Sequence, residues 1–222
     1  MKNSLILLSV LILLTLNVSA LAQDDEEDYE RDVLEINFFG GLDAPTGEML
    51  DWKDTLGAKA GFNFGLDLGY FVKEQLVAGF GFRFGQYSID AADADLAAAE
   101  LKHRLYNPHL YVKYYLMPYS DISPYLKANA GLTFLKFTTW VSNENGDRYR
   151  QLSYDPAYSF GIGGGIFLFT ADYGGLFVEG NYHHVSGSSV EAEYEGGTYS
   201  FDEDISAWDF HLGLRILVSS GG

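Results

Sequence analysis

The sequence predicts an all-β fold, an eight-stranded antiparallel up-and-down transmembrane β-barrel with short periplasmic turns and long extracellular loops. Three observations lead to this prediction. About eight segments alternate apolar with polar residues, the connections between them alternate between short and long, and an export signal precedes them. Residues 208–218 show the alternation most clearly, because every even position is apolar. In a transmembrane barrel, one face of each strand contacts lipid and the other faces the lumen.

Residues 1–22 are predicted to be a cleavable signal peptide. Lys2 is their only charge, and an apolar stretch leads to the small residues Ala20 and Ala22. The alternative is an uncleaved anchor helix, which would need roughly 20 apolar residues. We therefore exclude this segment from the predicted fold.

An acidic segment, residues 23–32, follows the signal and carries Arg31 as its only base. Runs of like charge repel one another, so we expect a flexible N-terminal tail, with an acidic docking motif as the alternative. The barrel is assigned to residues 33–222.

The composition narrows the possible partners. The chain has 14 basic against 31 acidic residues and a formal charge of −17, so nucleic acid is not an expected partner. It contains no cysteine, which argues against disulfides, thiolate chemistry and a lipidated N-terminus. About 200 residues after the signal suffice for one barrel without a second domain. We expect no cofactor.

Each strand is placed by its alternating apolar residues, and each boundary by charges or turn-forming residues. The last strand rises by about 3.3 Å per residue along its own axis. With a strand tilt near 40°, residues 208–218 span about 25 Å along the membrane normal, which is the height of an apolar membrane band. Short connections are predicted at 73–74, 117–123 and 171–175, and long ones at 43–55, 87–104, 138–155 and 186–204. The strands centre on residues 34–38, 62–70, 78–84, 110–116, 126–134, 158–168, 176–182 and 208–218.

Aromatic residues gather near the predicted strand ends, where membrane proteins carry interfacial girdles. Ordinary core packing would explain the position of any single aromatic residue. The evidence for a girdle is therefore the clustering of several of them. Those toward the short turns are Tyr70, Phe71, Tyr125 and Phe169, and those toward the loops are Tyr158 and Trp208.

Three segments resemble a known family. Residues 107–116 (NPHLYVKYYL), 123–131 (SPYLKANAG) and 177–182 (FVEGNY) are similar to the small eight-stranded outer-membrane β-barrels that include OmpX and the OmpA transmembrane domain. The resemblance covers nearly all of the chain after the signal. It implies a location in the cell outer membrane, with outer-membrane lipid and lipopolysaccharide as the surroundings.

The C-terminal strand resembles the signal that this family presents to the barrel assembly machinery. His211, Gly213, Ile216 and Val218 occupy the spaced positions of that signal. Aliphatic residues stand where the family usually has aromatic ones, and four residues follow the last of them. The resemblance implies that the barrel assembly machinery is a partner and that it recognises this strand.

The predicted lumen holds equal numbers of acids and bases with polar neighbours. An eight-stranded barrel has an interior that side chains fill, and buried ions are stable there only when paired. We therefore expect a filled, non-conducting lumen, with an ion or proton path or a narrow pore as the alternative. The acids are Glu35, Asp67, Glu179 and Asp209, the bases are Arg83, Lys113, Lys127 and Arg215, and the polar neighbours are Asn37, Asn63, Tyr111, Tyr115, Asn129, Asn181, His183 and His211.

One lumen pair follows from an assumed strand register. If Gly197 centres the last hairpin, Glu179 faces Arg215, Asn181 faces Gly213 and His183 faces His211. We predict an ion pair between Glu179 and Arg215, although a single β-bulge would shift the register.

The long loops carry most of the excess negative charge. Their acids number four, four, three and six in chain order. Such a surface is suited to binding divalent cations that lipopolysaccharide phosphates would share, or simply to solvation. Residues 188–201 and the Asn145-Gly146 turn are predicted to form hairpins above the membrane, which could bind a surface protein partner. The alanine-rich segment 90–103 is predicted to contain a short helix.

His184 and Ser186 are the candidate catalytic residues. The His-x-Ser sequence resembles part of the motif of outer-membrane lipid A deacylases, in which histidine activates serine toward an acyl ester. Gly187 stands where that family has asparagine, and no acid can be assigned as the third member. The histidines have no recognised zinc spacing, so no metal site is predicted, although a metal could bind near His183 and His211.

These observations favour a non-enzymatic outer-membrane barrel with a structural or surface-interaction role. The alternative is a narrow, passive, porin-like channel for ions or small solutes. A lipid A deacylase-like enzyme is the third possibility.

Overall fold

The computed structural model describes residues 33–46, 58–89, 102–118, 120–143, 146–153, 155–171, 174–194 and 197–219. The predicted signal peptide, the acidic tail and nearly all of the alanine-rich segment lie outside these residues. Within the described part, no helix is long and apolar enough to cross a membrane. The strands are β1 (Val33–Thr46), β2 (Ala58–Lys73), β3 (Leu76–Ile89), β4 (Lys102–Tyr115), β5 (Ile122–Asn143), β6 (Gly146–Ser153), β7 (Ala157–Ala171), β8 (Gly174–Tyr194) and β9 (Gly197–Ser219).

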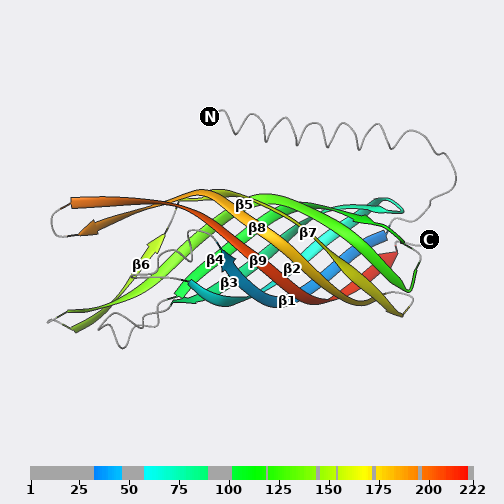
Figure 1. Cartoon of the computed structure of the whole chain (residues 1–222), viewed down its shortest axis with the longest axis horizontal. Helices are drawn as coiled ribbons and strands as arrows, with labels where there is room; N and C mark the ends of the chain where they lie inside the picture. Colours follow the sequence, from blue (N-terminus) through cyan, green and yellow to red (C-terminus); the bar gives the residue numbers. More distant parts are fainter. Residues whose placement is uncertain are drawn as a thin grey trace, which may run out of the picture.

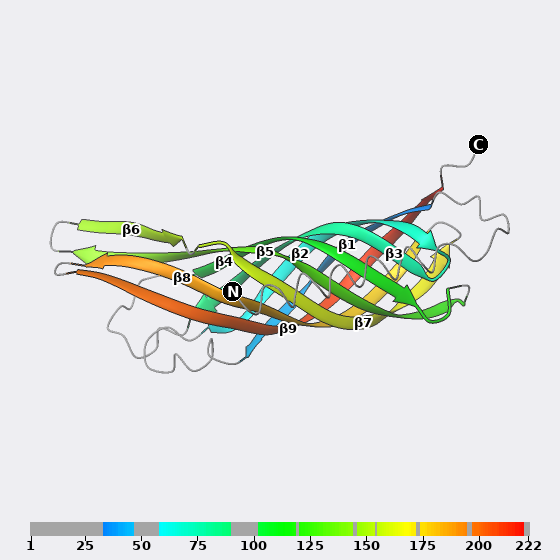
Figure 2. The same cartoon turned by 90° about the horizontal axis from the view of Figure 1, so that it is seen from above.

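Eight of these strands close into a barrel (Figures 1 and 2). The sheet runs in the order β4-β3-β2-β1-β9-β8-β7-β5, and β4 also pairs with β5, so the eight strands form a closed cylinder in which the first strand pairs with the last. All neighbours are antiparallel. The ninth strand, β6, lies outside the closed ring and pairs with the last third of β5. The predicted eight-stranded up-and-down barrel is confirmed.

The two ends of the barrel differ. At one end, which we call the turn end, short connections join β2 to β3 and β7 to β8. The beginning of β1 and the end of β9 also lie there (Figure 1). At the other, the hairpin end, two strand pairs extend beyond the ring. β5 and β6 pair out to Asn143 and Gly146, and β8 and β9 pair out to Tyr194 and Gly197. Both extensions match the hairpins that the sequence predicts.

The alternating residues separate into two faces. Large apolar side chains point away from the barrel on every one of its eight strands, among them Phe38, Leu110 and Leu212, which is 61% exposed. Such a belt costs free energy in water and is stable in lipid. Two predicted girdle residues belong to the other face. Tyr125 is buried in the lumen, and Phe71 stacks on lumen-facing Tyr115 with ring centroids 6.0 Å apart.

A charge on the outer face should destabilise the barrel according to its depth. Leu212 lies near the middle of the membrane-facing part of β9, and Val218 lies at its turn end. We expect Leu212→Arg to lower the free energy of unfolding by about 2–4 kcal/mol and Val218→Arg by about 0–1 kcal/mol. Urea titrations of the barrel folded in lipid vesicles measure both values. Equal losses would contradict the assignment of this face to lipid.

Candidate functional site: the barrel lumen

The inward face is formed by odd-numbered residues on all eight strands of the ring. The eight ionic side chains predicted for the lumen are all at most 5% exposed. Of the eight predicted polar neighbours, Asn129 is half-buried and the other seven are buried. The structure therefore places the predicted residues together, in a column that runs along the barrel axis.

Glu35 on β1 is the centre of the cluster at the turn end. Its carboxylate accepts hydrogen bonds from Lys113 Nζ at 2.6 Å, from the Tyr115 hydroxyl at 2.7 Å and from Asn37 Nδ2 at 2.6 Å. Arg215 Nε lies 3.1 Å from the second oxygen. Two cations thus share one buried carboxylate, and the hydrogen bonds offset part of its desolvation.

Aromatic rings surround this cluster. The Arg215 guanidinium lies 4.3 Å from the Phe167 ring centroid and 4.5 Å from that of Tyr115, and Lys113 Nζ lies 4.9 Å from that of Tyr125. Cation–π contacts of this kind stabilise a cation away from water. The buried cluster comprises Phe39, Val77, Tyr111, Tyr115, Tyr125, Phe167 and Phe177, with Phe71 packed against it.

Glycines on the inward face make room for these rings. A Cβ at Gly65 would overlap the Phe39 ring, and one at Gly213 would overlap the Phe177 ring. Each ring thus occupies the space that a neighbouring side chain would need. The lumen is filled at the turn end as a result.

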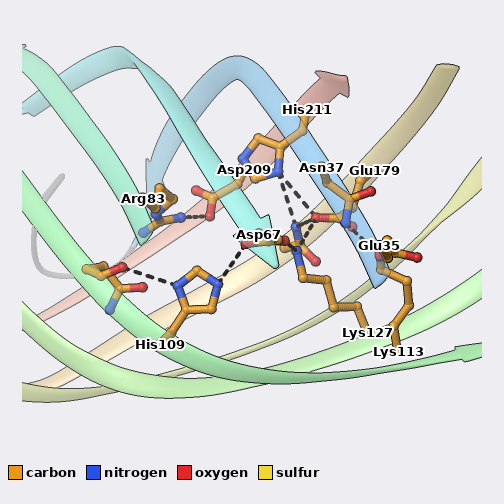
Figure 3. A network of polar contacts seen from close by, with 12 residues as sticks. Glu35, Asn37, Asp67, Arg83, His109, Lys113, Lys127, Glu179, Asp209 and His211 are labelled. Atoms are coloured by element: carbon orange, nitrogen blue, oxygen red, sulfur yellow. Dashed lines mark hydrogen bonds and ion pairs between the residues drawn. The ribbon is translucent and has the colours of Figure 1, made fainter. Parts of the chain in front are cut away.

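Lys127 on β5 joins two carboxylates halfway along the lumen (Figure 3). Its Nζ lies 2.8 Å from Asp67 Oδ2 and 3.0 Å from Glu179 Oε1. His109 approaches the other oxygen of Asp67 at 3.3 Å, while the Tyr125 hydroxyl donates to Glu179 Oε2 at 2.9 Å. Each charge in this layer has a charged or hydrogen-bonding partner.

Closer to the hairpin end, the polar contacts join other strands. Arg83 on β3 pairs with Asp209 on β9, and Asn63 donates to Asp43. Asn107 donates to Ser159 Oγ at 2.7 Å. Beyond them lie buried residues that are apolar or aromatic, namely Tyr87, Leu105, Leu135, Val185 and Ile205.

The predicted register of β8 and β9 is wrong. Glu179 is opposite His211, Asn181 is opposite Asp209, and His183 is opposite Ala207. The pair closes between Tyr194 and Gly197, earlier than assumed, and a register shift lies between Val185 and Ser188. The predicted Glu179–Arg215 ion pair is therefore not formed, since Arg215 contacts Glu35 and Glu179 contacts Lys127.

The sequence analysis did not assign several lumen-facing residues to the lumen. Asp43 and Tyr87 were assigned to loops, because the glycines and proline near them weaken the strand pattern, but β1 and β3 extend past both. Their odd numbers continue the inward parity of each strand, a signal that could have placed them. The other polar residues in this group, all buried, are His103, Asn107, Ser123, Tyr125, Thr133 and Ser159.

The candidate catalytic residues lie on the outer face. Ser186 is exposed, and His184 is half-buried. His184 Nδ1 lies 2.8 Å from the Oγ of Ser206 on β9. The serine that hydrogen-bonds to His184 is therefore Ser206 and not Ser186. The His184 ring also packs 4.9 Å from that of Phe160. In the part of the chain that the structure describes, no carboxylate contacts His184, so a third member of a triad is missing there.

No model of a known protein family matches the chain, and no curated protein sequence matches it. Solved structures do match in fold. Neisserial surface protein A aligns with 13% identity and a TM-score of 0.55 over 82% of this chain and 96% of its own. A major outer membrane protein from Thermus thermophilus aligns with 10% identity and a TM-score of 0.56 over 83% of this chain and 99% of its own.

The outer membrane protein OprG from Pseudomonas aeruginosa gives a similar result. It aligns with 11% identity and a TM-score of 0.52, over 87% of this chain and 99% of its own. The chain thus has the fold of small outer-membrane β-barrels, and the resemblance predicted from the sequence is confirmed at that level.

The bridge formed by Lys127 can be tested against a lysine on the same strand. Lys127→Met leaves Asp67 and Glu179 buried without their shared cation, and we expect a loss of about 3–5 kcal/mol in the free energy of unfolding. Lys136 is exposed on β5, and Lys136→Met should cost less than about 1 kcal/mol. Urea titrations in detergent measure both. If Lys127→Met were as mild as the control, the ionic network would have no structural role.

Proposed function

We propose that this chain is a non-enzymatic barrel of the outer membrane with a structural or surface-interaction role, and that its lumen does not conduct ions. The filled lumen is the observation that carries the proposal. Aromatic side chains close the turn end, paired ions occupy the middle, and buried apolar side chains follow at the hairpin end. The fold shared with outer-membrane barrels supports the location.

The contacts within the lumen argue against a water-filled path. A hydrated ion would have to displace the Arg215 guanidinium from Phe167 and Glu35, or pass between Lys127 and its two carboxylates. Each step breaks buried ion pairs, which costs several kcal/mol per uncompensated charge. A narrow porin-like channel is therefore the weaker proposal.

The outer face gives little support to an enzyme. A nucleophilic serine needs a general base within hydrogen-bond reach, and the hydrogen bond of His184 is to the largely buried Ser206 rather than to Ser186. The lipid A deacylase alternative therefore lacks its central contact.

We propose that a partner protein binds to the two extended hairpins. β9 pairs with β1 only as far as Ser206, opposite Thr46. From Gly197 to Ile205, β9 pairs only with β8 among the described residues, so the backbone groups on its other edge have no strand partner there. An edge of this kind accepts a strand from another protein. The assembly machinery and lipopolysaccharide are further proposed partners, through the C-terminal strand and the acidic loops.

Conductance distinguishes the filled barrel from the channel. We expect the purified wild-type barrel to give no unitary current steps in a planar lipid bilayer. A triple variant, Tyr115→Ala with Phe167→Ala and Phe177→Ala, removes three rings of the turn-end cluster and should produce steps. This variant also shows that the assay can detect an opened lumen. Reproducible steps from the wild type would favour the channel.

Removing the β8–β9 extension tests the surface role. The variant lacks residues 188–203, which pair only with each other, so the barrel should fold with an unchanged urea midpoint. Cells that display it should lose the adhesion to surfaces or to other cells that the intact chain confers. A second deletion, of residues 139–150, tests the β5–β6 hairpin in the same way. If neither deletion reduced adhesion, the surface role would not belong to these hairpins.

A further inference from the structure

Two acidic residues face each other where the barrel closes. Asp43 on β1 is directly opposite Asp209 on β9, and both side chains point into the lumen with at most 1% exposure. Like charges in directly opposed positions destabilise a sheet. His211 follows two residues after Asp209 and is 4% exposed. One potential ligand atom from each of these three residues lies within 4.8 Å of the other two.

Each of the three side chains has one polar atom in use and another without a partner. Asp43 Oδ1 accepts from Asn63, and Asp209 Oδ2 pairs with Arg83. The remaining atoms, Asp43 Oδ2, Asp209 Oδ1 and His211 Nε2, are buried and have no hydrogen-bond partner among the described residues. Burying polar atoms in this way is costly unless something binds them. The Tyr87 side chain lies beside Asp43.

The charges in the described lumen do not balance. The buried acids are Glu35, Asp43, Asp67, Glu179 and Asp209, against Arg83, Lys113, Lys127 and Arg215. Every acid but Asp43 forms an ion pair with one of these bases. Among the described residues Asp43 therefore remains a buried carboxylate without a cation.

We propose that Asp43, Asp209 and His211 form a binding site for a divalent transition-metal ion of the zinc class. Zinc binds imidazole nitrogens and carboxylate oxygens, and its open sites have three protein ligands with water as the fourth. The imidazole favours zinc over calcium or magnesium, which take oxygen ligands. Tetrahedral zinc bonds of about 2.0–2.2 Å place ligand atoms about 3.3–3.6 Å apart, so shifts of up to about 1 Å in each side chain would complete the site.

The neighbours of His211 orient it for this role. Its Nδ1 lies 3.4 Å from Glu179 Oε1, and in Figure 3 the opposite edge of its ring is turned toward Asp209. A carboxylate that accepts the proton of one ring nitrogen leaves the other nitrogen free to bind a metal. The sequence analysis paired His211 with His183, but His183 is opposite Ala207. In the proposed site, His211 is joined by the two aspartates beside it and not by His183.

A bound metal would link the first strand of the barrel to the last. Asp43 belongs to β1, whereas Asp209 and His211 belong to β9, and these two strands form the seam that closes the ring. An ion that binds the folded chain and not the unfolded one raises its stability. The proposal therefore predicts both retained metal and a change in unfolding.

Zinc itself is the probe for the test. The chain without its signal and without a histidine tag is folded from urea into detergent micelles with either excess Zn²⁺ or EDTA. After gel filtration, atomic emission measures the zinc that each sample retains. We expect about one zinc per chain, and a higher urea midpoint for the zinc-folded sample than for the EDTA sample. Folding with zinc present gives the ion access to a buried site.

Four variants locate the bound ion. Asp43→Asn and His211→Gln should retain less than a tenth of the zinc and lose the rise in urea midpoint. Asp204→Asn removes an exposed carboxylate from the same strand, and His184→Gln removes an imidazole from the outer face, so both should behave as the wild type.

Two outcomes would overturn the proposal, and the first of them needs no variant. Wild-type chain that retains no zinc after folding with it would show that Asp43, Asp209 and His211 do not form a metal site. Zinc that is retained equally by Asp43→Asn and by the wild type would show that the ion is bound elsewhere, for example by the acidic loops.

Discussion

The pairing of β1 with β9 is the constraint on which the rest of the structure depends. In lipid, an unpaired edge strand would leave its backbone groups without hydrogen bonds, so the sheet has to close on itself. Closure with eight strands produces an interior that side chains fill. Every ionic residue on the inward face must then find its partner inside the barrel, because little water can reach it. The ion pairs of the lumen follow from this closure.

Most of the ion pairs join strands that are not neighbours in the sheet, and Arg215 with Glu35, on the paired strands β9 and β1, is an exception. Lys113 on β4 and Lys127 on β5 are directly opposite each other, an unfavourable pairing on its own. Lys113 is neutralised by Glu35 from β1, and Lys127 by Asp67 from β2 and Glu179 from β8. Each contact spans the lumen and would be lost if one strand were displaced. The network therefore opposes both flattening of the cylinder and entry of water along its axis.

The sequence was enough to assign residues to faces. Successive side chains of a strand point in opposite directions, so one clear apolar run fixes the face of every residue in that strand. This logic placed Glu35, Arg83 and Asp209 in the lumen without any knowledge of which strands pair. It failed for Asp43, because Gly40, Gly41 and Pro45 obscure the alternation at the end of β1. It failed for Tyr125 as well, because an aromatic near a strand end was assigned to the membrane interface although its parity was inward.

The partners of each lumen residue could not be predicted in the same way, because they depend on register. In the predicted register Glu179 meets Arg215, and in the structure it meets His211, four residues away on the same face of β9. An even displacement leaves every side chain on its own face and exchanges all of its partners. The position of the hairpin and a register shift near Val185 decide between the two arrangements, and neither has a strong local signal. A lumen pair is thus a property of the closed barrel, so a register shift of two residues can rewire the ionic network while the same residues stay on the lipid-facing surface.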